Sequence, residues 1–401
     1  SRIHIHKGDW SGEKSLMGQP STYISAFLSN REEWAPKQLS SNEGIAFQGS
    51  VVLGKGFMLE PNEAQRMLDD DPRNADVLFP CLSGQDLNTD PEQKPSRWVI
   101  NFWDWSEERA ATYKAPYGHL LRTVKSKREK QKRKKYRERW WQHAEAVPRL
   151  YHAIGRGTSF ERHPEGYSPA SKVSDFVLVR GMDSKHNTFA MIQNDQIFNQ
   201  TLNVFSHANI YHYAVLSSEI HAFWFYKYCA RLGASAYPRY IQTDVFKTFP
   251  NPKPENDIGR EIKELGSKLW SLRKSYMSAH KVGLTSLFNL ENDPGNIDAQ
   301  MVYIREIEIK IDTLVMRAYC WDDIDLQHNF REVSYLPESD CIRFTISEKA
   351  ETQVLKRLEQ LNKERYEAEV SENLHEKPSG KNKSKRTSSS STSAAQREME
   401  V

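Results

Sequence analysis

The 401-residue sequence has only four cysteines, Cys81, Cys229, Cys320 and Cys341, and no two of them form a CxxC pair. This spacing argues against a structural zinc site and against a disulfide framework. The sequence also lacks an uninterrupted apolar run of about 20 residues, the length needed to cross a membrane. Its first residues do not have the pattern of a signal peptide. We therefore expect a soluble cytoplasmic protein with no membrane partner and no metal ligands.

The sequence starts without methionine and enters at once a pattern typical of a strand, at residues 3–6, followed by a turn at Gly8. We therefore expect further sequence upstream of residue 1. A chain of this length can form two or three domains that each bury a core.

Residues 71–109 contain two short apolar runs, 77–79 and 98–102, with prolines and a glycine around them. Turn formers on both sides of a short apolar run indicate a buried strand rather than a helix. This stretch is therefore predicted to form a strand, an ordered loop and a second strand.

The same stretch carries a family resemblance, together with residues 46–50, 54–57 and 63–64 before it and RERWWQHAE (137–145) and RYIQTDVFKTFP (239–250) after it. In this order the motifs resemble the target recognition region of the MmeI-like (type IIG and IIL) restriction-modification proteins. These are bacterial defence enzymes in which a DNA adenine-N6 methyltransferase is fused to a restriction enzyme. The resemblance runs from about residue 7 to about residue 375. It implies double-stranded DNA as a partner, a methyltransferase domain or chain upstream, and S-adenosylmethionine as cofactor of the parent enzyme.

Two motifs that such a methyltransferase needs are not found in this sequence. One is the F-x-G-x-G loop for S-adenosylmethionine, and the other is the [NDS]-P-P-[YFW] tetrapeptide that holds the flipped adenine. We therefore expect no catalytic residues and no cofactor in this chain. Its predicted role is to recognise the DNA site and position it for a catalytic domain not present in this chain.

The predicted fold is α+β, in four parts. Residues 1–40 resemble the end of the methyltransferase domain and a linker, and residues 41–252 are predicted to form a mixed α/β recognition domain. Apolar stripes at 258–276 and 297–318 predict an antiparallel helix pair in a C-terminal helical domain, residues 253–372. Ser347 is expected to cap a third helix to about residue 370. Residues 373–401 are rich in Lys and Ser and predict a disordered tail.

Residues 125–139, which we call the basic segment, contain ten Lys or Arg and two Glu. Tyr136, Trp140, Ala144 and Val147 follow a helical spacing, so the segment is predicted to continue into an amphipathic helix with the two tryptophans Trp140 and Trp141 in the core. A solvated helix face is the plain interpretation. With the resemblance, we favour phosphate contacts on duplex DNA, which set affinity and register. The expected backbone contacts are Lys125, Lys127, Arg128, Lys130, Lys132, Arg133, Lys134, Lys135 and Arg137.

Two further polar groups are candidates for contacts with base edges. Apolar runs at 176–180 and 188–192 predict a hairpin whose turn, residues 181–187, would present polar side chains at a sheet edge. Residues 232–240 predict a loop that, by the resemblance, helps to set which bases are recognised. Arg, Lys, Ser and His are residue types that read base edges. The expected base-recognition residues are Arg180, Ser184, Lys185, His186, Ser235, Tyr237, Arg239 and Tyr240.

Several other interpretations stay open. Residues 45–59 are predicted to form a glycine-rich strand pair. Its glycines at 49, 54 and 56 fit no phosphate-loop motif and are predicted to serve turns. Asp175 with Asp183 and Lys185 superficially matches a metal-dependent DNA nuclease, but the predicted strand and turn need not bring the two carboxylates together. A third possibility is a non-catalytic interaction protein built on the helix pair. Residues 209–231 are predicted to form one largely buried helix, in which His212 and His221 are core histidines.

Overall fold

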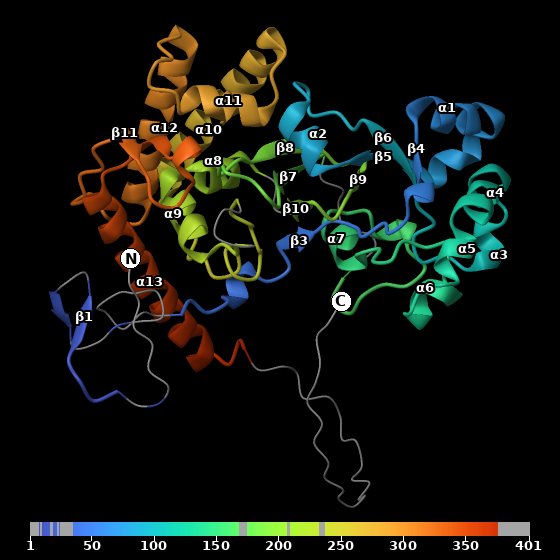
Figure 1. Cartoon of the computed structure of the whole chain (residues 1–401), viewed down its shortest axis with the longest axis horizontal. Coiled ribbons are helices and arrows are strands. Elements are labelled where there is room, and N and C mark those ends of the chain that lie inside the picture. Colours follow the sequence, from blue (N-terminus) through green and yellow to red (C-terminus); the bar gives the residue numbers. More distant parts are fainter. Residues whose placement is uncertain are drawn as a thin grey trace, which may run out of the picture.

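The protein is described here by a computed structural model that covers residues 8, 10–16, 19–21, 24, 35–167, 175–206, 209–231 and 237–375. The predicted strand at residues 3–6 and the predicted tail beyond residue 375 lie outside the described residues. Two four-stranded sheets lie between two groups of helices, with α10, α11 and α12 toward one end and α1 and α3–α6 at the other (Figure 1). A separate short pair, β1 (Lys14–Leu16) and β2 (Gln19–Ser21), lies near the N-terminus. None of the described helices is both long and apolar enough to cross a membrane.

The first sheet has the strand order β3-β10-β7-β8 and is antiparallel throughout. Its strands are β3 (Ala46–Gln48), β7 (Phe176–Gly181), β8 (Ala190–Gln193) and β10 (Leu202–Phe205). The predicted hairpin between residues 176 and 192 is confirmed, since β7 pairs with β8. Alternate residues of a strand point to opposite faces. Leu178 enters one apolar cluster and Val177 and Val179 enter another, so both faces of this sheet are buried.

The second sheet has the order β4-β6-β5-β9, in which only β5 and β9 are parallel. Its strands are β4 (Met58–Leu59), β5 (Leu78–Leu82), β6 (Arg97–Ile100) and β9 (Ile197–Phe198). The two strands predicted around residues 77–79 and 98–102 are therefore confirmed as neighbours. Residues 45–59 do not pair with each other as a glycine-rich strand pair, because β3 and β4 belong to different sheets.

Short helices occupy much of the chain between β4 and β7. They are α1 (Pro61–Asp70), α2 (Gly84–Thr89), α3 (Glu107–Ala110), α4 (Lys114–Thr123), α5 (Lys125–Arg128), α6 (Lys134–Glu138) and α7 (Pro148–Ala153). The predicted amphipathic helix through residue 147 is wrong, because α5 and α6 are single turns and the chain leaves the helical conformation after Glu138. Like charges at helical spacing disfavour a long helix here. Trp140 and Trp141 are nevertheless buried, as predicted.

The apolar segment after β10 forms two helices, α8 (Ile210–Ser217) and α9 (Glu219–Tyr228), rather than one. Ser218 between them has an extended backbone, and its hydroxyl accepts a hydrogen bond from the backbone N–H of His221 at 3.5 Å. A serine at this position caps the N-terminus of the second helix. His221 is fully buried, so it is a core histidine as predicted, whereas His212 is half-buried and lies outside the core.

The C-terminal region contains α10 (Asn256–His280), α11 (Leu284–Glu291), α12 (Ala299–Ala318) and α13 (Glu348–Ser371). The predicted pairing of the two long stripes is confirmed by the packing of α10 against α12. Ser347 caps α13, as predicted, by accepting a hydrogen bond from the N–H of Ala350 at 3.3 Å. The sequence did not predict α11 or the antiparallel hairpin of β11 (Asn329–Glu332) and β12 (Ile342–Thr345).

The apolar core extends across residue 252, where we predicted a domain boundary. One cluster contains Leu178 and Phe205 of the first sheet and Trp224 of α9, together with Ile262 of α10 and Leu358 of α13. The C-terminal helices therefore cover one face of the first sheet. Side chains of the β11–β12 hairpin consequently lie close to the turns that follow β7.

Candidate nucleic-acid interface

The basic segment lies on the surface beside the second sheet, at the α5 and α6 end of the molecule (Figure 1). Two of its cations form ion pairs that are open to water, Lys134 with Glu138 at 3.5 Å and Lys135 with Glu145 at 3.0 Å. Exposed pairs of this kind are weak and easily exchanged for another anion. The exposed cations of the segment are Lys127, Lys130, Lys132, Arg133, Lys134, Lys135, Arg137 and Arg139.

Arg128 is an exception within the basic segment, because it is 2% exposed. Its Nη2 donates hydrogen bonds to the carbonyl oxygens of Val52 and Gln142, both at 3.1 Å. Its guanidinium carbon lies 5.3 Å from the ring centre of Phe57 and 5.4 Å from that of Tyr136. Burial lowers the pKa of Arg128. The expectation that Arg128 contacts phosphate is therefore corrected: it fastens the segment to the protein. Lys125 is half-buried, with its Nζ 5.2 Å from the ring centre of Trp140.

A groove of about 160 Å³ separates the basic segment from the glycine-containing turn at residues 53–56. Gly54 has a φ of +134°, a conformation that side chains disfavour. A Cβ on Gly56 would lie 2.5 Å from the hydroxyl oxygen of Thr123, so only glycine allows this approach to α4. Gly54 thus serves a turn, as predicted, whereas Gly56 allows a close contact that the sequence did not predict. Lys55 and Lys127 line the groove from opposite sides.

Among the expected base-recognition residues, Arg180 is buried and cannot reach a base. Its Nη1 donates to the side-chain oxygen of Asn187 at 3.1 Å. The guanidinium carbon lies 4.0 Å from the ring centre of Tyr240 and 4.3 Å from that of Phe225. Burial lowers the pKa of Arg180 to about 10. This correction follows from the aromatic side chains of α9 and residue 240, which close over the first sheet.

Ser184, His186 and Tyr240 are also buried, and their assignment to base contacts is corrected in the same way. The Ser184 hydroxyl accepts from the N–H of His186 at 3.1 Å, and His186 Nε2 lies 3.0 Å from the side-chain oxygen of Asn289 in α11. Burial, followed by the charge of Arg343, lowers the pKa of His186 to about 3. The Tyr240 hydroxyl lies 3.1 Å from His221 Nε2. Ser184 and His186 in the turn after β7 point inward because the C-terminal region covers that side of the turn.

Three of the expected residues keep exposed surface, and we call Lys185, Tyr237 and Arg239 the recognition edge. Arg239 forms a two-pronged contact with Asp183, with Nε 3.0 Å from Oδ1 and Nη2 3.1 Å from Oδ2. Lys185 Nζ lies 2.5 Å from Oδ1 of Asp340, and the Tyr237 hydroxyl donates to Oδ2 of the same carboxylate at 3.2 Å. Ser235 lies outside the described residues. Asp183 and Asp340 were not predicted as partners.

The described residues give the nuclease hypothesis no metal site. Asp175 precedes β7 and Asp183 follows it, so the two carboxylates are separated by a six-residue strand, about 20 Å long. Asp183 is paired with Arg239 and Lys185 with Asp340. In the part of the chain that the structure describes, no group of three or more His, Cys, Asp or Glu side chains is arranged to hold a metal ion.

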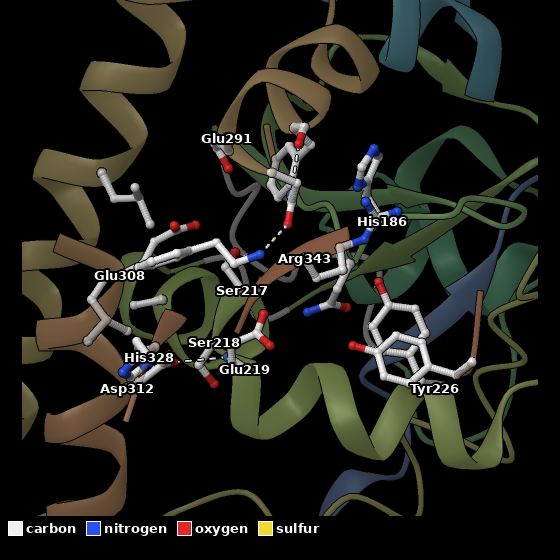
Figure 2. A pocket seen from close by; sticks show the side chains of 18 residues that line it. His186, Ser217, Ser218, Glu219, Tyr226, Glu291, Glu308, Asp312, His328 and Arg343 are labelled. Carbon is white, nitrogen blue, oxygen red and sulfur yellow. Dashed lines mark hydrogen bonds and ion pairs between the residues drawn. The ribbon is translucent and has the colours of Figure 1, made fainter. Parts of the chain in front are cut away.

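A polar cavity of about 50 Å³ lies where α8, α9, α11, α12 and the β11–β12 hairpin meet (Figure 2). Asp312 accepts from the N–H of Glu219 at 2.9 Å and pairs with His328 Nε2 at 2.8 Å. Burial, followed by the charge of Asp312, raises the pKa of Glu219 to about 7. Burial lowers the pKa of His328, but the bond to Asp312 outweighs it and the net shift is upward. The volume suits a few water molecules and no larger ligand. We therefore interpret this cluster as a buried polar contact between α8 and α9 on one side and the C-terminal region on the other, and we call it the seam.

The fold and the surface together define an α+β protein with an exposed basic segment and a separate polar edge supported by a C-terminal helical region. The sequence model of the family described as "MmeI, target recognition domain" matches residues 25–253, more than half of the chain. The chain therefore belongs to the MmeI target recognition domain family. No curated protein matched the chain.

The fold is also similar to a solved structure of the type IIL restriction-modification enzyme MmeI in complex with DNA. The TM-score is 0.58 at 15% sequence identity, and the similarity covers 87% of this chain. The chain spans 39% of the length of that structure. Since the match extends well beyond residues 25–253, the shared fold includes much of the C-terminal helical region.

Proposed function

We propose that this chain recognises a specific sequence in duplex DNA for a restriction-modification enzyme. The observation that carries the proposal is the exposed basic segment on a member of the MmeI target recognition domain family. DNA presents one negative charge for about every 1.7 Å of duplex axis, so closely spaced Lys and Arg side chains bind it without sequence preference. The similarity to an enzyme whose structure contains DNA supports the same ligand here.

Phosphate contacts and base contacts have separate locations in this proposal. The basic segment lies at one end of the long axis, whereas β11, next to the recognition edge, lies toward the other end (Figure 1). The two therefore lie apart on the molecule (Figure 1). One turn of duplex spans about 34 Å, so one duplex is long enough to contact two separate surfaces of a protein. In our proposal, a duplex lies along the molecule: the basic segment binds its phosphates at one place and the recognition edge contacts its bases at another.

Methyl transfer is assigned to a separate part of the system. In our proposal, a methyltransferase domain or chain binds S-adenosylmethionine and transfers its methyl group to N6 of an adenine that is flipped out of the duplex. The present chain chooses the site and holds the flanking DNA during that step. The setting is cytoplasmic bacterial defence.

A selection experiment tests the proposal. The purified chain is incubated with a library of duplexes that carry a randomised central region, and the bound fraction is sequenced. We expect enrichment of one short motif over several rounds. Binding without enrichment would leave a nonspecific DNA-binding protein and would contradict the recognition function.

A further inference from the structure

The segment that joins β11 to β12, residues 333–341, contacts two residues of the recognition edge and two further residues, Arg231 and Tyr226. Asp340 accepts from both Lys185 and Tyr237, which lie 155 and 103 residues away in sequence. Arg231 Nη2 donates to the backbone oxygen of Tyr335 at 2.7 Å. The ring of Tyr335 stacks on that of Tyr226 at a centroid distance of 4.2 Å and an angle of 19°.

These contacts connect the turn after β7 with the residues that follow α9, although the two lie far apart in the sequence. The Tyr226 hydroxyl donates to the backbone oxygen of Lys185 at 3.0 Å, so the stacked tyrosines also fix the turn after β7. Arg239 pairs with Ala230 through backbone hydrogen bonds of 2.9 and 3.0 Å, which place Arg239 close to Arg231. The joining segment therefore contacts both Lys185 and Tyr237 and the residues that hold the recognition edge in place.

The carboxylate of Asp340 is the centre of this arrangement. The Lys185 and Asp340 side chains are only 17% and 13% exposed, so water screens their attraction weakly. Burial raises the pKa of Asp340, but the bonds from Lys185 and Tyr237 outweigh it and the net shift is downward. Asp340 is thus ionised at neutral pH and takes up both donors. A long lysine loses much rotamer freedom when it is held in this way.

We propose that Asp340 is a positioning residue for sequence discrimination: it fixes Lys185 and Tyr237 so that they meet base edges in one orientation. The proposal rests on the proposed DNA-recognition function. Discrimination between bases requires donors and acceptors at set places in the groove, whereas contact with phosphates tolerates mobile side chains. The C-terminal hairpin would then influence which sequence is chosen without touching the bases.

A variant without the charge of Asp340 distinguishes a role in positioning Lys185 and Tyr237 from a role in stability alone. In Asp340→Asn the shape is kept, but Lys185 loses its counter-charge and gains freedom to contact phosphates. We expect discrimination between the preferred and a scrambled duplex to fall about 10-fold, on the scale of one good base contact. Affinity for the scrambled duplex should stay the same or rise, and the dependence of affinity on salt should become steeper by at most about one phosphate contact. A loss of structure would instead weaken both duplexes.

The experiment measures binding to the preferred and scrambled duplexes by fluorescence anisotropy over a range of salt concentrations. Glu338→Gln removes one negative charge from the same turn and serves as the matched control, with unchanged discrimination expected. Tyr237→Phe removes one donor to Asp340 and should lower discrimination partially. It should add little when combined with Asp340→Asn, since both act through one contact.

The outcomes are distinct. If the unaltered chain fails to discriminate, the proposed function itself is contradicted, and this inference with it. If the unaltered chain discriminates and Asp340→Asn does so equally well, only the positioning role is overturned. Should Asp340→Asn melt below the assay temperature, Asp340→Glu decides the matter, because it keeps the charge but displaces the carboxylate from Lys185 and Tyr237: reduced discrimination supports the role, and unchanged discrimination overturns it.

Discussion

Arg128 and its sequence neighbours carry the same charge but occupy opposite environments. The guanidinium of Arg128 binds two backbone oxygens from segments 76 and 14 residues away, while the side chains of Lys127 and Lys130 extend into water. A buried donor that loses its partner costs free energy, as does a buried carbonyl. One arginine thus holds the basic segment in place so that the others remain available to a ligand.

Replacing Arg128 should therefore lower stability rather than affinity alone. For Arg128→Met we expect a loss of about 1–3 kcal/mol in the free energy of unfolding, because the oxygens of Val52 and Gln142 lose their donors. The measurement is urea unfolding at neutral pH. Lys130→Met, which removes an exposed charge from the same segment, is the control and should leave stability within about 0.5 kcal/mol. Equal stability of the two variants would mean that Arg128 does not fasten the segment.

Arg239 should affect the choice of sequence more than the strength of binding. Its guanidinium is held in one orientation by Asp183 and is about one-third exposed. In Arg239→Ala we expect a different preferred sequence in the library selection, with little change in affinity for unrelated duplexes. Arg66→Ala, an exposed arginine on α1, should change neither property. If Arg239→Ala weakened all sequences equally, its role in base recognition would be wrong.

At the residue scale, the exposure of a side chain could be predicted from the sequence where many charges lie close together. Ten cations in fifteen residues cannot all be buried, so most of the basic segment had to face water. The inward position of Arg180 and His186 was not predictable in this way. Their partners Tyr240 and Asn289 lie 60 and 103 residues further along the chain, and no local sequence pattern predicts contacts over such separations.

At the scale of elements, the buried Arg273 of α10 joins the C-terminal helices to each other and to α8. Glu308, the exception in its apolar stripe, pairs with Arg273 of α10, which also binds Glu291 of α11 through Nε and Nη2, both at 2.9 Å. Arg273 Nη1 donates to the Tyr213 hydroxyl of α8 at 3.2 Å. One guanidinium therefore connects four helices.

Removing Arg273 should be severe because it leaves buried carboxylates without a counter-charge. For Arg273→Met we expect a loss of about 3–5 kcal/mol, measured by urea unfolding of the whole chain. Arg260→Met, at an exposed position of the same helix, should cost less than about 0.5 kcal/mol. A small effect at Arg273 would show that the carboxylates simply take up protons and need no arginine.

The seam around Glu219 should make stability depend on pH. The unfolded carboxyl has a pKa near 4.5, and burial raises the folded value to about 7, so the folded protein binds a proton that the unfolded chain releases between these values. The free energy of unfolding should therefore fall as pH rises from about 4.5 to about 7, by on the order of 3 kcal/mol from this group.

Glu219→Gln keeps a polar group without a charge, so the profile between pH 5 and pH 8 should become flatter and stability at pH 8 should increase. Glu351, whose pKa burial also raises to about 7, should retain part of the slope. The measurement is urea unfolding at four pH values. Parallel profiles for the variant and the unaltered chain would contradict this assignment.

The elements themselves were predicted where spacing is strongly periodic. The long stripes that became α10 and α12 have a clear helical period. The two apolar runs that became β7 and β8 have no period and were predicted because they are short and flank a segment of turn residues. The β11–β12 hairpin was missed because its strands are only four residues long and half-exposed. The single helix predicted for residues 209–231 is broken at Ser218, whose hydroxyl competes for the backbone N–H of the next turn.

At the scale of the whole molecule, the recognition domain and the C-terminal helices are one packed body around the first sheet. The family resemblance predicted the order of the parts, which stays a prediction. It did not predict that the C-terminal region would cover the turn after β7. The predicted boundary near residue 252 remains a prediction about the chain and does not mark a gap in the core.

The most direct test of DNA binding by the basic segment is the salt dependence of affinity for duplex DNA. Anisotropy titrations between about 50 and 200 mM salt should give a steep linear fall of log K with log salt concentration, with a slope of about −0.9 per phosphate contact. The double variant Lys132→Ala with Arg133→Ala should flatten the slope by about 0.9 for each phosphate that it no longer neutralises. The control variant Lys263→Ala with Lys274→Ala, which removes two exposed charges from α10, should keep it. No binding to duplex DNA at the lowest salt concentration, with the fold intact, would contradict the account.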